Sequence, residues 1–515
     1  KRVAIIGAGS AGFAALKTFV HDIPKPDGQR WEIDLFEQRN GLGGVWSDDS
    51  SARYPYLPET PLYPQLYTNT PVPTMTYPNF PFPPYTPLYP AYDRIQAYHQ
   101  NFATHFNLYP YIHLNHSLES AYWVGNASMG FWELSISTNG RQEEIIPFNK
   151  TSTYNSRHRP RITRRFDHLV VANGHNHYPR IPSWATDHAA NEWLRNGKGR
   201  NIVHSIYFRE PEEYAGKIIL VVGAGGSGVD IVTQSSAHAK KVYHSFSSHG
   251  RHAPPWEVPG TIYKPRTKGF TSSCVQFEDG TEVFDVELVI LATGYDYRFP
   301  FLDPSDPYNR PTRGIPTRER YAIVTTNASA LSRTEGERRL TENLNYLFPL
   351  DRQIVSLSSL HPLNALLFIG LPFAIPNAPS DIAQSIFAGH LIAQPDRTLA
   401  RELLLRNLTA FENRLADEGF DVYVLGHKMN IGSYTDVEYQ DSLIAHLQSQ
   451  GLVPSHDGGY VFVEPWRIRA REKVLELRMV WKEIENRGEE EVKRWLDGVE
   501  SEEEWADLMD RLLKW

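Results

Sequence analysis

The feature that most constrains the fold is the glycine pattern Gly7-Ala8-Gly9-Ser10-Ala11-Gly12. It stands between Arg2–Gly7 (RVAIIG), a short apolar run typical of a buried parallel strand, and Ser10–Val20, which has helical character. In such a GxGxxG pattern the first glycine makes a tight turn, the second lets the backbone approach a pyrophosphate, and the third allows close helix packing. The pyrophosphate then faces the positive end of the helix. The pattern therefore predicts a Rossmann-type dinucleotide site formed by Gly7, Gly9 and Gly12.

An acidic residue supports this prediction. Glu37 follows the short strand Ile33–Phe36 and lies 25 positions after Gly12 (37 minus 12). A carboxylate at this strand end accepts hydrogen bonds from ribose hydroxyls. Gly43-Gly44-Val45-Trp46 comes next, and its small residues would let the loop lie against a cofactor. The alternatives are a glycine-rich turn without a ligand and, for Trp46, a core or lid aromatic.

A second glycine pattern, Gly223-Ala224-Gly225-Gly226-Ser227-Gly228, follows the apolar run Lys217–Val222 and precedes a helix. It lies 216 positions after the first (223 minus 7). One chain with two such units implies two dinucleotides, or two halves of a redox pair. The predicted contact residues here are Gly223, Gly225, Ser227 and Gly228.

The end of the next strand, Val242–Phe246, indicates which nicotinamide nucleotide the second unit takes. Ser247-Ser248-His249-Gly250-Arg251 follows it and contains no acidic residue, whereas NAD-specific sites usually carry one. The hydroxyl of Ser247 and the cation of Arg251 favour a 2′-phosphate, hence NADPH. The alternative is an ordinary basic loop. Further along, Ala292-Thr293-Gly294-Tyr295 forms a turn at the end of a buried strand, where ligands sit in open α/β sheets.

Composition excludes several other classes of protein. The 515 residues allow two to four domains, and the net charge of -8 argues against a nucleic-acid partner. No stretch approaches the roughly 18 apolar residues of a transmembrane span. The single cysteine, Cys274, excludes a dithiol redox pair and an internal disulfide, and no cluster has metal-ligand spacing.

Two further segments carry expectations of their own. Tyr54–Pro90 is rich in Pro and Tyr, which predicts an ordered, extended loop rather than a flexible linker. Trp466–Trp515 alternates apolar and charged residues at helical spacing and predicts packed amphipathic helices. The first residue, Lys1, is not Met, which is compatible with a removed leader, and five glycosylation sequons occur. The compartment therefore stays open between the cytoplasm and the secretory pathway.

Taken together, these motifs resemble the flavin-containing monooxygenases, particularly the fungal branch that oxygenates nitrogen or sulfur. The resemblance covers nearly the whole chain. It rests on the two glycine patterns and on six further segments: Phe36–Trp46, Leu66–Pro71, Asn173–His175, His204–Phe208, Leu291–Tyr295 and Pro379–Gln384. One departure stands before His204, where Lys198 and Arg200 occupy positions that the family gives to Phe and Gly.

The resemblance implies an α/β fold with two Rossmann-type domains. An FAD-binding domain would comprise residues 1–195 and 293–515, with an NADPH-binding domain of residues 196–292 inserted. The second FAD part would carry a surface insertion at about 305–342 and the C-terminal helices. By the same resemblance Gly44, Trp46, Thr293, Gly294 and Gln384 would bind FAD, and His204 and Ser205 would bind NADPH. Asn69, in the motif Leu66–Pro71, would sit beside the reactive edge of the flavin as the catalytic residue.

The resemblance also implies a reaction. NADPH would reduce FAD, reduced FAD would form a C4a-hydroperoxide with O2, and NADP⁺ would stay bound to shield it. An amine or sulfide would then take one oxygen atom. The other interpretations are a Baeyer–Villiger-type oxygenase, an NADPH oxidase and a non-catalytic nucleotide-binding sensor. The expected partners are this small molecule and O2, and a homodimer is possible.

Overall fold

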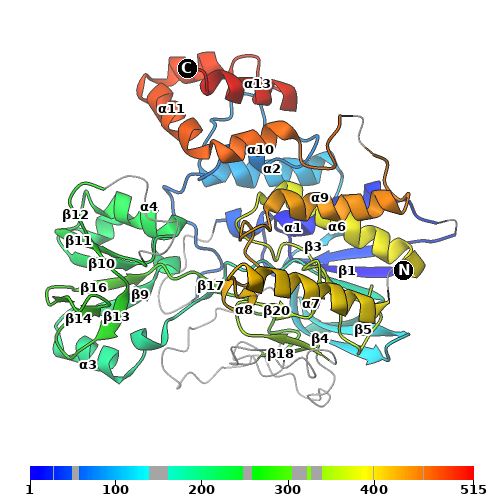
Figure 1. The fold of residues 1–515 in the computed structure, drawn as a ribbon, viewed down its shortest axis with the longest axis horizontal. Helices are drawn as coiled ribbons and strands as arrows, with labels where there is room; N and C mark the ends of the chain where they lie inside the picture. The colour runs from blue at the N-terminus through cyan, green and yellow to red at the C-terminus, as the bar shows by residue number, and fades with distance from the viewer. Residues whose placement is uncertain are drawn as a thin grey trace.

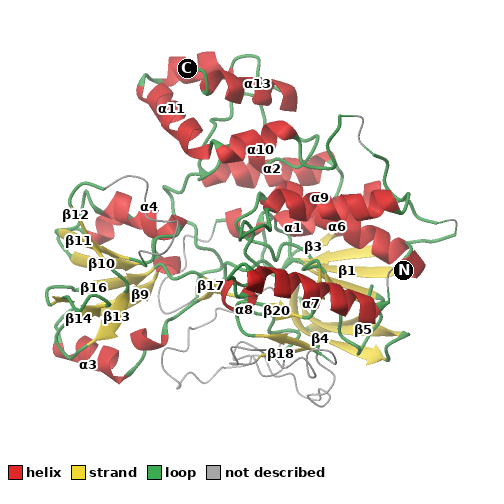
Figure 2. Ribbon diagram, in the orientation of Figure 1, coloured by secondary structure: helices red, strands yellow, loops and turns green. Residues whose placement is uncertain are grey.

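The computed structural model describes residues 1–26, 28–48, 57–138, 160–247, 258–303, 322–325, 339–397, 400–455 and 458–515. Two α/β units lie side by side in Figure 1, and a group of C-terminal helices stands above them. Figure 2 shows strands in both units, with helices α4 and α3 on either side of the strands of one unit and α1, α6 and α9 above the strands of the other.

The first unit is built on a seven-stranded sheet of order β21-β22-β23-β7-β1-β2-β3. Its members are β1 (Arg2–Ile6), β2 (Glu32–Phe36), β3 (Ile112–His113), β7 (His168–Val171), β21 (Leu350–Asp351), β22 (Val355–Ser356) and β23 (Leu366–Phe368). The β1 strand runs parallel to both of its neighbours, β2 and β7, and β23 joins β7 in parallel. The sheet therefore combines strands from distant parts of the chain around the first glycine pattern.

Side chains of β1 alternate between two cores, as the pleat of a strand requires. Val3 and Ile5 pack with α1 (Ser10–Lys17), α2 (Tyr92–His105), α6 (Asn377–Ala393) and α9 (Asp436–Ser449). Ala4 and Ile6 face the other way, toward the antiparallel meander of β4 (Ser117–Gly125), β5 (Gly130–Ser137) and β6 (Arg161–Phe166). Burial on both faces explains why β1 reads as a continuous apolar run.

The second unit has a five-stranded parallel sheet of order β12-β11-β10-β16-β9. Its strands are β9 (Asn201–His204), β10 (Ile218–Val222), β11 (Lys241–Ser245), β12 (Thr261–Lys264) and β16 (Leu288–Leu291). Helix α4 (Gly226–Ser235) packs on one face through Ile231 and Val232. The other face contacts α3 (His188–Asn196) and the small sheet of β13 (Thr267–Phe270), β14 (Val275–Phe277) and β15 (Glu282–Val283).

Helix α3 packs with the second unit. Ala190 and Trp193 share a core with Leu220 and Val289 of the second sheet, so α3 belongs to the second unit. The sequence had placed this helix in the first part of the FAD-binding domain, which was expected to extend to residue 195. The boundary lies before α3 because Trp193 needs the apolar face of the second sheet to be buried.

The chain enters and leaves the second unit at one place. Strand β8 (Tyr178–Pro179) precedes the unit, β17 (Tyr295–Asp296) follows it, and the two pair antiparallel. Arg180, the residue after β8, forms an ion pair with Asp296 of β17, and its Nε lies 3.0 Å from Asp296 Oδ1. The second unit therefore lies between two adjacent crossings of the chain, with parts of the first unit before and after it.

The remaining segments cover the first unit. The helices are α7 (Arg401–Asp417), α8 (Val422–Leu425), α10 (Pro465–Glu472), α11 (Val474–Asn486), α12 (Glu489–Leu496) and α13 (Glu502–Leu512). Helices α10 and α13 lie above α2 in Figure 1, and α13 buries Trp505 and Leu508, as the amphipathic pattern predicts. Within the predicted surface insertion, β18 (Ile323–Thr325) pairs with β19 (Leu340–Glu342), and β19 pairs with β20 (Leu347–Phe348), which lies just after the insertion. Residues 304–321 and 326–338 lie outside the described part. No helix of the described ranges is both long and apolar enough to cross a membrane.

Candidate dinucleotide sites

The first glycine turn tolerates no side chain at two of its positions. Gly7 has φ +105°, and a Cβ there would lie 2.5 Å from the carbonyl oxygen of Ala172. A Cβ at Gly12 would lie 1.9 Å from the carbonyl oxygen of Gly7. The N–H of Gly7 donates to the Phe36 carbonyl at 2.9 Å, which fixes the turn at the end of β1. These contacts are the physical reason for the first and third glycines.

The second glycine turn repeats this geometry. Gly223 has φ +112°, and its Cβ would lie 2.3 Å from the Ala292 carbonyl oxygen. A Cβ at Gly228 would lie 2.0 Å from the Gly223 carbonyl oxygen. The N–H of Gly223 donates to the Ser245 carbonyl at 2.8 Å. Both turns thus place a helix N-terminus at the carboxyl end of a parallel strand, the position of phosphate groups in such folds.

A cavity of about 240 Å³ opens at the first turn. Five predicted cofactor residues line it: Gly7, Gly9, Glu37, Gly44 and Trp46. Gly9 and Gly44 face each other so closely that a Cβ on Gly44 would lie 2.7 Å from the Cα of Gly9. The wall at this point is bare backbone, which is what a pyrophosphate requires.

Glu37 organises the loops at the rim of this cavity. Its carboxylate accepts hydrogen bonds from the N–H groups of Ala8 at 2.8 Å and Arg39 at 2.9 Å. The side chain is buried, and burial raises the pKa of its carboxyl group. Arg39 in turn donates to the Gly44 carbonyl at 2.7 Å. The carboxylate therefore stands at the end of β2, where a ribose would meet it.

Sequence reasoning missed an acidic residue on the opposite wall. Asp381, in the first turns of α6, lines the cavity and accepts a hydrogen bond from the Ser10 hydroxyl at 2.8 Å. It is 3% exposed, and burial raises the pKa of its carboxyl group to about 7. Gly370, Asn173 and His116 also line the cavity and were not predicted. Asn173 and Asp381 lie in two of the segments that carry the resemblance, but only three-dimensional proximity shows that they line one cavity.

Four predicted FAD residues are not among those that line the cavity: Gly12, Thr293, Gly294 and Gln384. Thr293 donates its hydroxyl to the Arg180 carbonyl at 2.6 Å, and the Gly294 carbonyl accepts from the Arg180 N–H at 2.9 Å. Both residues thus stabilise the crossing between the units. The side chain of Gln384 accepts from the Gly370 N–H at 3.1 Å and donates to Ser380, so it positions the wall at Gly370 without facing the cavity. Thr293, Gly294 and Gln384 therefore each make hydrogen bonds to other parts of the protein.

The residues predicted to bind NADPH differ in how exposed they are to solvent. Gly225 and Ser247 are exposed, and Ser227 is half-buried at the start of α4. Ser205 is buried, and Arg251 lies outside the described residues. Gly225 and Ser247 are therefore accessible at the surface of the second turn.

His204, which the resemblance assigns to NADPH, lies inside the second unit. It is fully buried at the end of β9. Its Nε2 is 3.0 Å from the Gly294 carbonyl, and its Nδ1 accepts from the Ile206 N–H at 3.1 Å. Burial lowers the pKa of the ring to about 3, so the imidazole is neutral. In this arrangement His204 holds two backbone segments together and is not exposed to a ligand.

Asn69 lies between the two units. Residues 57–90 form the extended, packed segment that the sequence predicts, with the short helix η3 (Val72–Met75). Asn69 is exposed, and a Cβ on Gly226 would lie 3.7 Å from its Nδ2. The segment is tied to α4 by the Tyr63 hydroxyl, which donates to Asp230 Oδ2 at 2.6 Å. Asn69 therefore faces the second glycine turn, and it is not among the residues lining the first cavity.

The fold and the two glycine turns define a protein with two dinucleotide-binding units, one inserted in the other. The model of the flavin-binding monooxygenase-like family matches residues 1–252 and 254–308, and the chain belongs to that family. The residues at the first turn fit FAD, because any Cβ at Gly9 or Gly44 would fill the space beside their bare backbone, and the Glu37 carboxylate lines the same cavity at the end of β2.

Individual proteins that the chain is similar to also have names of monooxygenases. The chain is 30% identical to the thiol-specific monooxygenase of Saccharomyces cerevisiae, over 59% of this chain and 63% of that protein. It is 27% identical to human flavin-containing monooxygenase 3, over 59% of this chain and 64% of that protein. These matches span less than two thirds of either relative. The structure of S-allyl-L-cysteine S-oxygenase from Allium sativum has the same fold, with a TM-score of 0.68, 20% identity and coverage of 100% of this chain and 99% of that one.

Proposed function

We propose that the protein is an FAD- and NADPH-dependent monooxygenase that transfers one oxygen atom from O2 to a nucleophilic sulfur or nitrogen of a small molecule. The second oxygen atom leaves as water, and NADPH supplies the two electrons. The observation that carries the proposal is the pair of matched glycine turns, one of which opens on a cavity with an acidic residue at the ribose position. Family membership supports it.

FAD would be held by the residues of the first cavity. The turn Gly7–Gly12 and the N-terminus of α1 would take the pyrophosphate, and Glu37 would accept hydrogen bonds from a ribose. Bound FAD would supply the chemistry that protein side chains lack, namely hydride acceptance and activation of O2. The chain's own residues then bind, orient and exclude water.

NADPH would be held at the second turn. The backbone of Gly223–Gly228 and the N-terminus of α4 would take its pyrophosphate, and Ser247 and Arg251 would select the 2′-phosphate. Asn69 reaches this turn from the Pro-rich segment, so its amide could hydrogen-bond the nicotinamide nucleotide where the two units meet.

Sulfur is the first substrate class to test. The name of the yeast relative specifies a thiol, whereas another relative, from human, is named a putative N-oxide-forming dimethylaniline monooxygenase. A soft nucleophile needs little acid–base assistance from the protein, which is consistent with the neutral, buried state of His204. A Baeyer–Villiger oxygenase, an NADPH oxidase and a non-catalytic sensor remain the competing functions.

One experiment separates these functions. The purified protein should be yellow, and NADPH should bleach its flavin absorbance under nitrogen. With isotopically labelled O2, methyl phenyl sulfide and dimethylaniline should acquire the label, and cyclohexanone should not. Labelled lactone alone would indicate a Baeyer–Villiger enzyme, and hydrogen peroxide without any labelled product an oxidase. A colourless protein that binds NADPH would indicate a sensor.

A further inference from the structure

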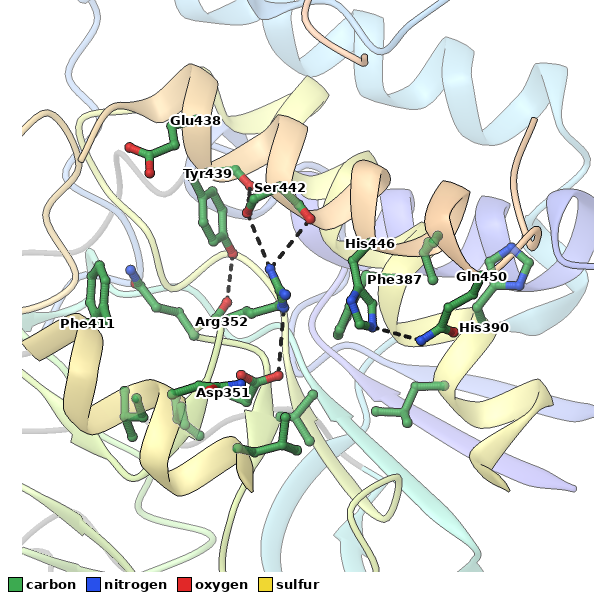
Figure 3. A pocket seen from close by; sticks show the side chains of 18 of the residues that line it. Asp351, Arg352, Phe387, His390, Phe411, Glu438, Tyr439, Ser442, His446 and Gln450 are labelled. Atoms are coloured by element: carbon green, nitrogen blue, oxygen red, sulfur yellow. Dashed lines mark hydrogen bonds and ion pairs between the residues drawn. The ribbon is translucent and has the colours of Figure 1, made fainter. Parts of the chain in front are cut away.

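A second cavity lies in the first unit, away from both glycine turns. It has a volume of about 270 Å³ and is formed by α6, α7, α9 and the turn between β21 and β22 (Figure 3). All its lining residues fall between Tyr346 and Leu452. The family model ends at residue 308, so this cavity lies outside the part of the chain that defines the family.

The walls of this cavity are largely apolar. Helix α7 contributes Leu404, Leu408 and Phe411, and α6 contributes Phe387 and Leu391 on the other side. Leu408 is 6% exposed and Phe387 is 7% exposed. Such walls would bury the hydrocarbon part of a ligand, since apolar area removed from water is the main source of affinity in small-molecule sites.

Arg352 brings a cation among these apolar walls. It lies in the tight turn after β21, with φ +51°, and Figure 3 shows it between Ser442 and Asp351. Its Nη1 is 3.4 Å from both the carbonyl and the hydroxyl oxygen of Ser442, and its Nε is 3.9 Å from Asp351 Oδ2. All three distances are at the long end of their range. The N–H groups of the Arg352 guanidinium can therefore still donate shorter hydrogen bonds to a ligand oxygen.

The charges around the cavity favour an anion. Besides Arg352, the lining residues include Arg397 and Arg414, against the two carboxylates Asp351 and Glu438. Three cations minus two anions leave a net charge of +1. Glu438 is already paired with Arg414 at 3.4 Å, and burial raises the pKa of the Asp351 carboxyl group to about 6.

The two histidines of the cavity add polarity without charge. Burial lowers the pKa of both His390 and His446. His446 Nε2 lies 3.1 Å from Gln450 Nε2. His390 is 4% exposed, and its buried Nδ1 has no hydrogen-bond partner among the residues that the structure describes.

From these contacts we infer that the second cavity binds an apolar monocarboxylate, such as a medium-chain or aryl-substituted carboxylic acid. Its carboxylate would pair with Arg352, and its hydrocarbon body would lie between α6 and α7. Helix α6 contributes Phe387 to this cavity and Asp381 to the dinucleotide cavity, so one rigid element joins the two sites. The inference is independent of the proposed reaction.

Titration calorimetry of the flavin-loaded protein tests the site with decanoate, and with decanol as the uncharged probe of equal chain length. Decanoate should bind at one site and at least about tenfold more tightly than decanol, because a charge-assisted hydrogen bond is lost with the alcohol. Arg352→Gln should weaken decanoate by about tenfold or more and leave decanol unchanged. Arg397→Gln, on an exposed arginine of the same cavity, serves as the matched control and should have a smaller effect.

A second variant keeps the test decisive if Arg352→Gln does not fold. Leu408→Trp would fill the cavity with a larger apolar side chain and should abolish binding of both probes. Binding of decanoate that survives Leu408→Trp, or that matches decanol in affinity, would overturn the inference. So would competition between decanoate and NADPH, which would place the probe in the dinucleotide sites.

Discussion

The hydroxyl of Tyr63 donates a 2.6 Å hydrogen bond to the carboxylate of Asp230, and this bond ties the Pro-rich segment to α4. The Tyr63 ring also packs edge-on against Phe208, with ring centroids 5.1 Å apart. Because Asn69 lies six positions further along the same segment (69 minus 63), the bond helps to hold Asn69 near the second glycine turn.

Tyr63→Phe should destabilise the protein and weaken NADPH binding. The variant removes the donor and leaves the half-buried Asp230 carboxylate without it, which costs about 1–3 kcal/mol of unfolding free energy. Urea unfolding and the KM for NADPH measure the two effects. Tyr67→Phe, on an exposed tyrosine of the same segment, is the control and should change stability by less than about 0.5 kcal/mol. Equal losses in both variants would show that the bond to Asp230 has no special role.

Gly9→Val should abolish flavin retention. A Cβ at Gly9 already lies 3.4 Å from the Cα of Gly44, so the branched side chain would occupy the bare backbone wall meant for a pyrophosphate. The matched control is Gly225→Val in the second turn, where a Cβ meets no atom within 4 Å. That variant should stay yellow and lose NADPH binding. A folded, fully yellow Gly9→Val protein would contradict the FAD assignment.

Arg251→Ala should reduce NADPH binding selectively. If Arg251 pairs with the 2′-phosphate, its removal costs about 1.5–3 kcal/mol, the range of charge-assisted hydrogen bonds. Binding of NADH, which lacks this phosphate, should change little. Dissociation constants for both nucleotides, measured on the oxidised protein, decide the matter, and an equal loss for both would assign Arg251 another role.

Asn69→Leu should uncouple NADPH oxidation from oxygenation of the substrate. Leucine is similar in size but cannot hydrogen-bond a nucleotide at the second turn. Flavin content and the anaerobic rate of reduction by NADPH should be nearly unchanged, while the share of NADPH oxidation that ends as hydrogen peroxide should rise. Gln65→Leu, on an exposed residue of the same segment, controls for the added apolar surface. If substrate oxygenation in Asn69→Leu stays coupled to NADPH use, Asn69 is a structural turn residue.

Asp381 should make stability depend on pH. Its pKa is about 7 in the folded protein and 3.8 for an ordinary aspartate, so the folded state holds an extra proton between these values. Stability therefore falls as pH rises through this window. Asp381→Asn cannot ionise, and from about pH 5 to about pH 8 it should gain on the order of 3 kcal/mol relative to the parent in urea unfolding. Asp396→Asn, on an exposed carboxylate, should follow the parent at every pH.

The parts of the site that the sequence predicts are those set by local contacts. Gly12 meets the carbonyl of Gly7, five positions earlier, so the pattern itself contains the constraint. Glu37 is equally predictable because it ends the strand beside β1. The same reasoning located the second turn, where Gly228 meets Gly223.

What the sequence could not predict depends on distant packing. Asp381 reaches Ser10 across 371 positions, and no local pattern announces that contact. Gln384 was assigned to FAD from its motif, but its side chain is used to hold Gly370. Trp193 looked like part of the first unit, and only the second sheet offers the apolar surface that buries it.

The second unit lies between the crossings β8 and β17, and this position in the chain affects the order in which the two units can fold during synthesis. All strands of the second sheet lie between Asn201 and Leu291, so that sheet can close as soon as β16 has left the ribosome. The first sheet must wait for β23 (Leu366–Phe368), and α1 stays uncovered until α6 (Asn377–Ala393) is made. Because domains fold as units during translation, the inserted unit should be the first to become native, and the unit that begins the chain should be the last.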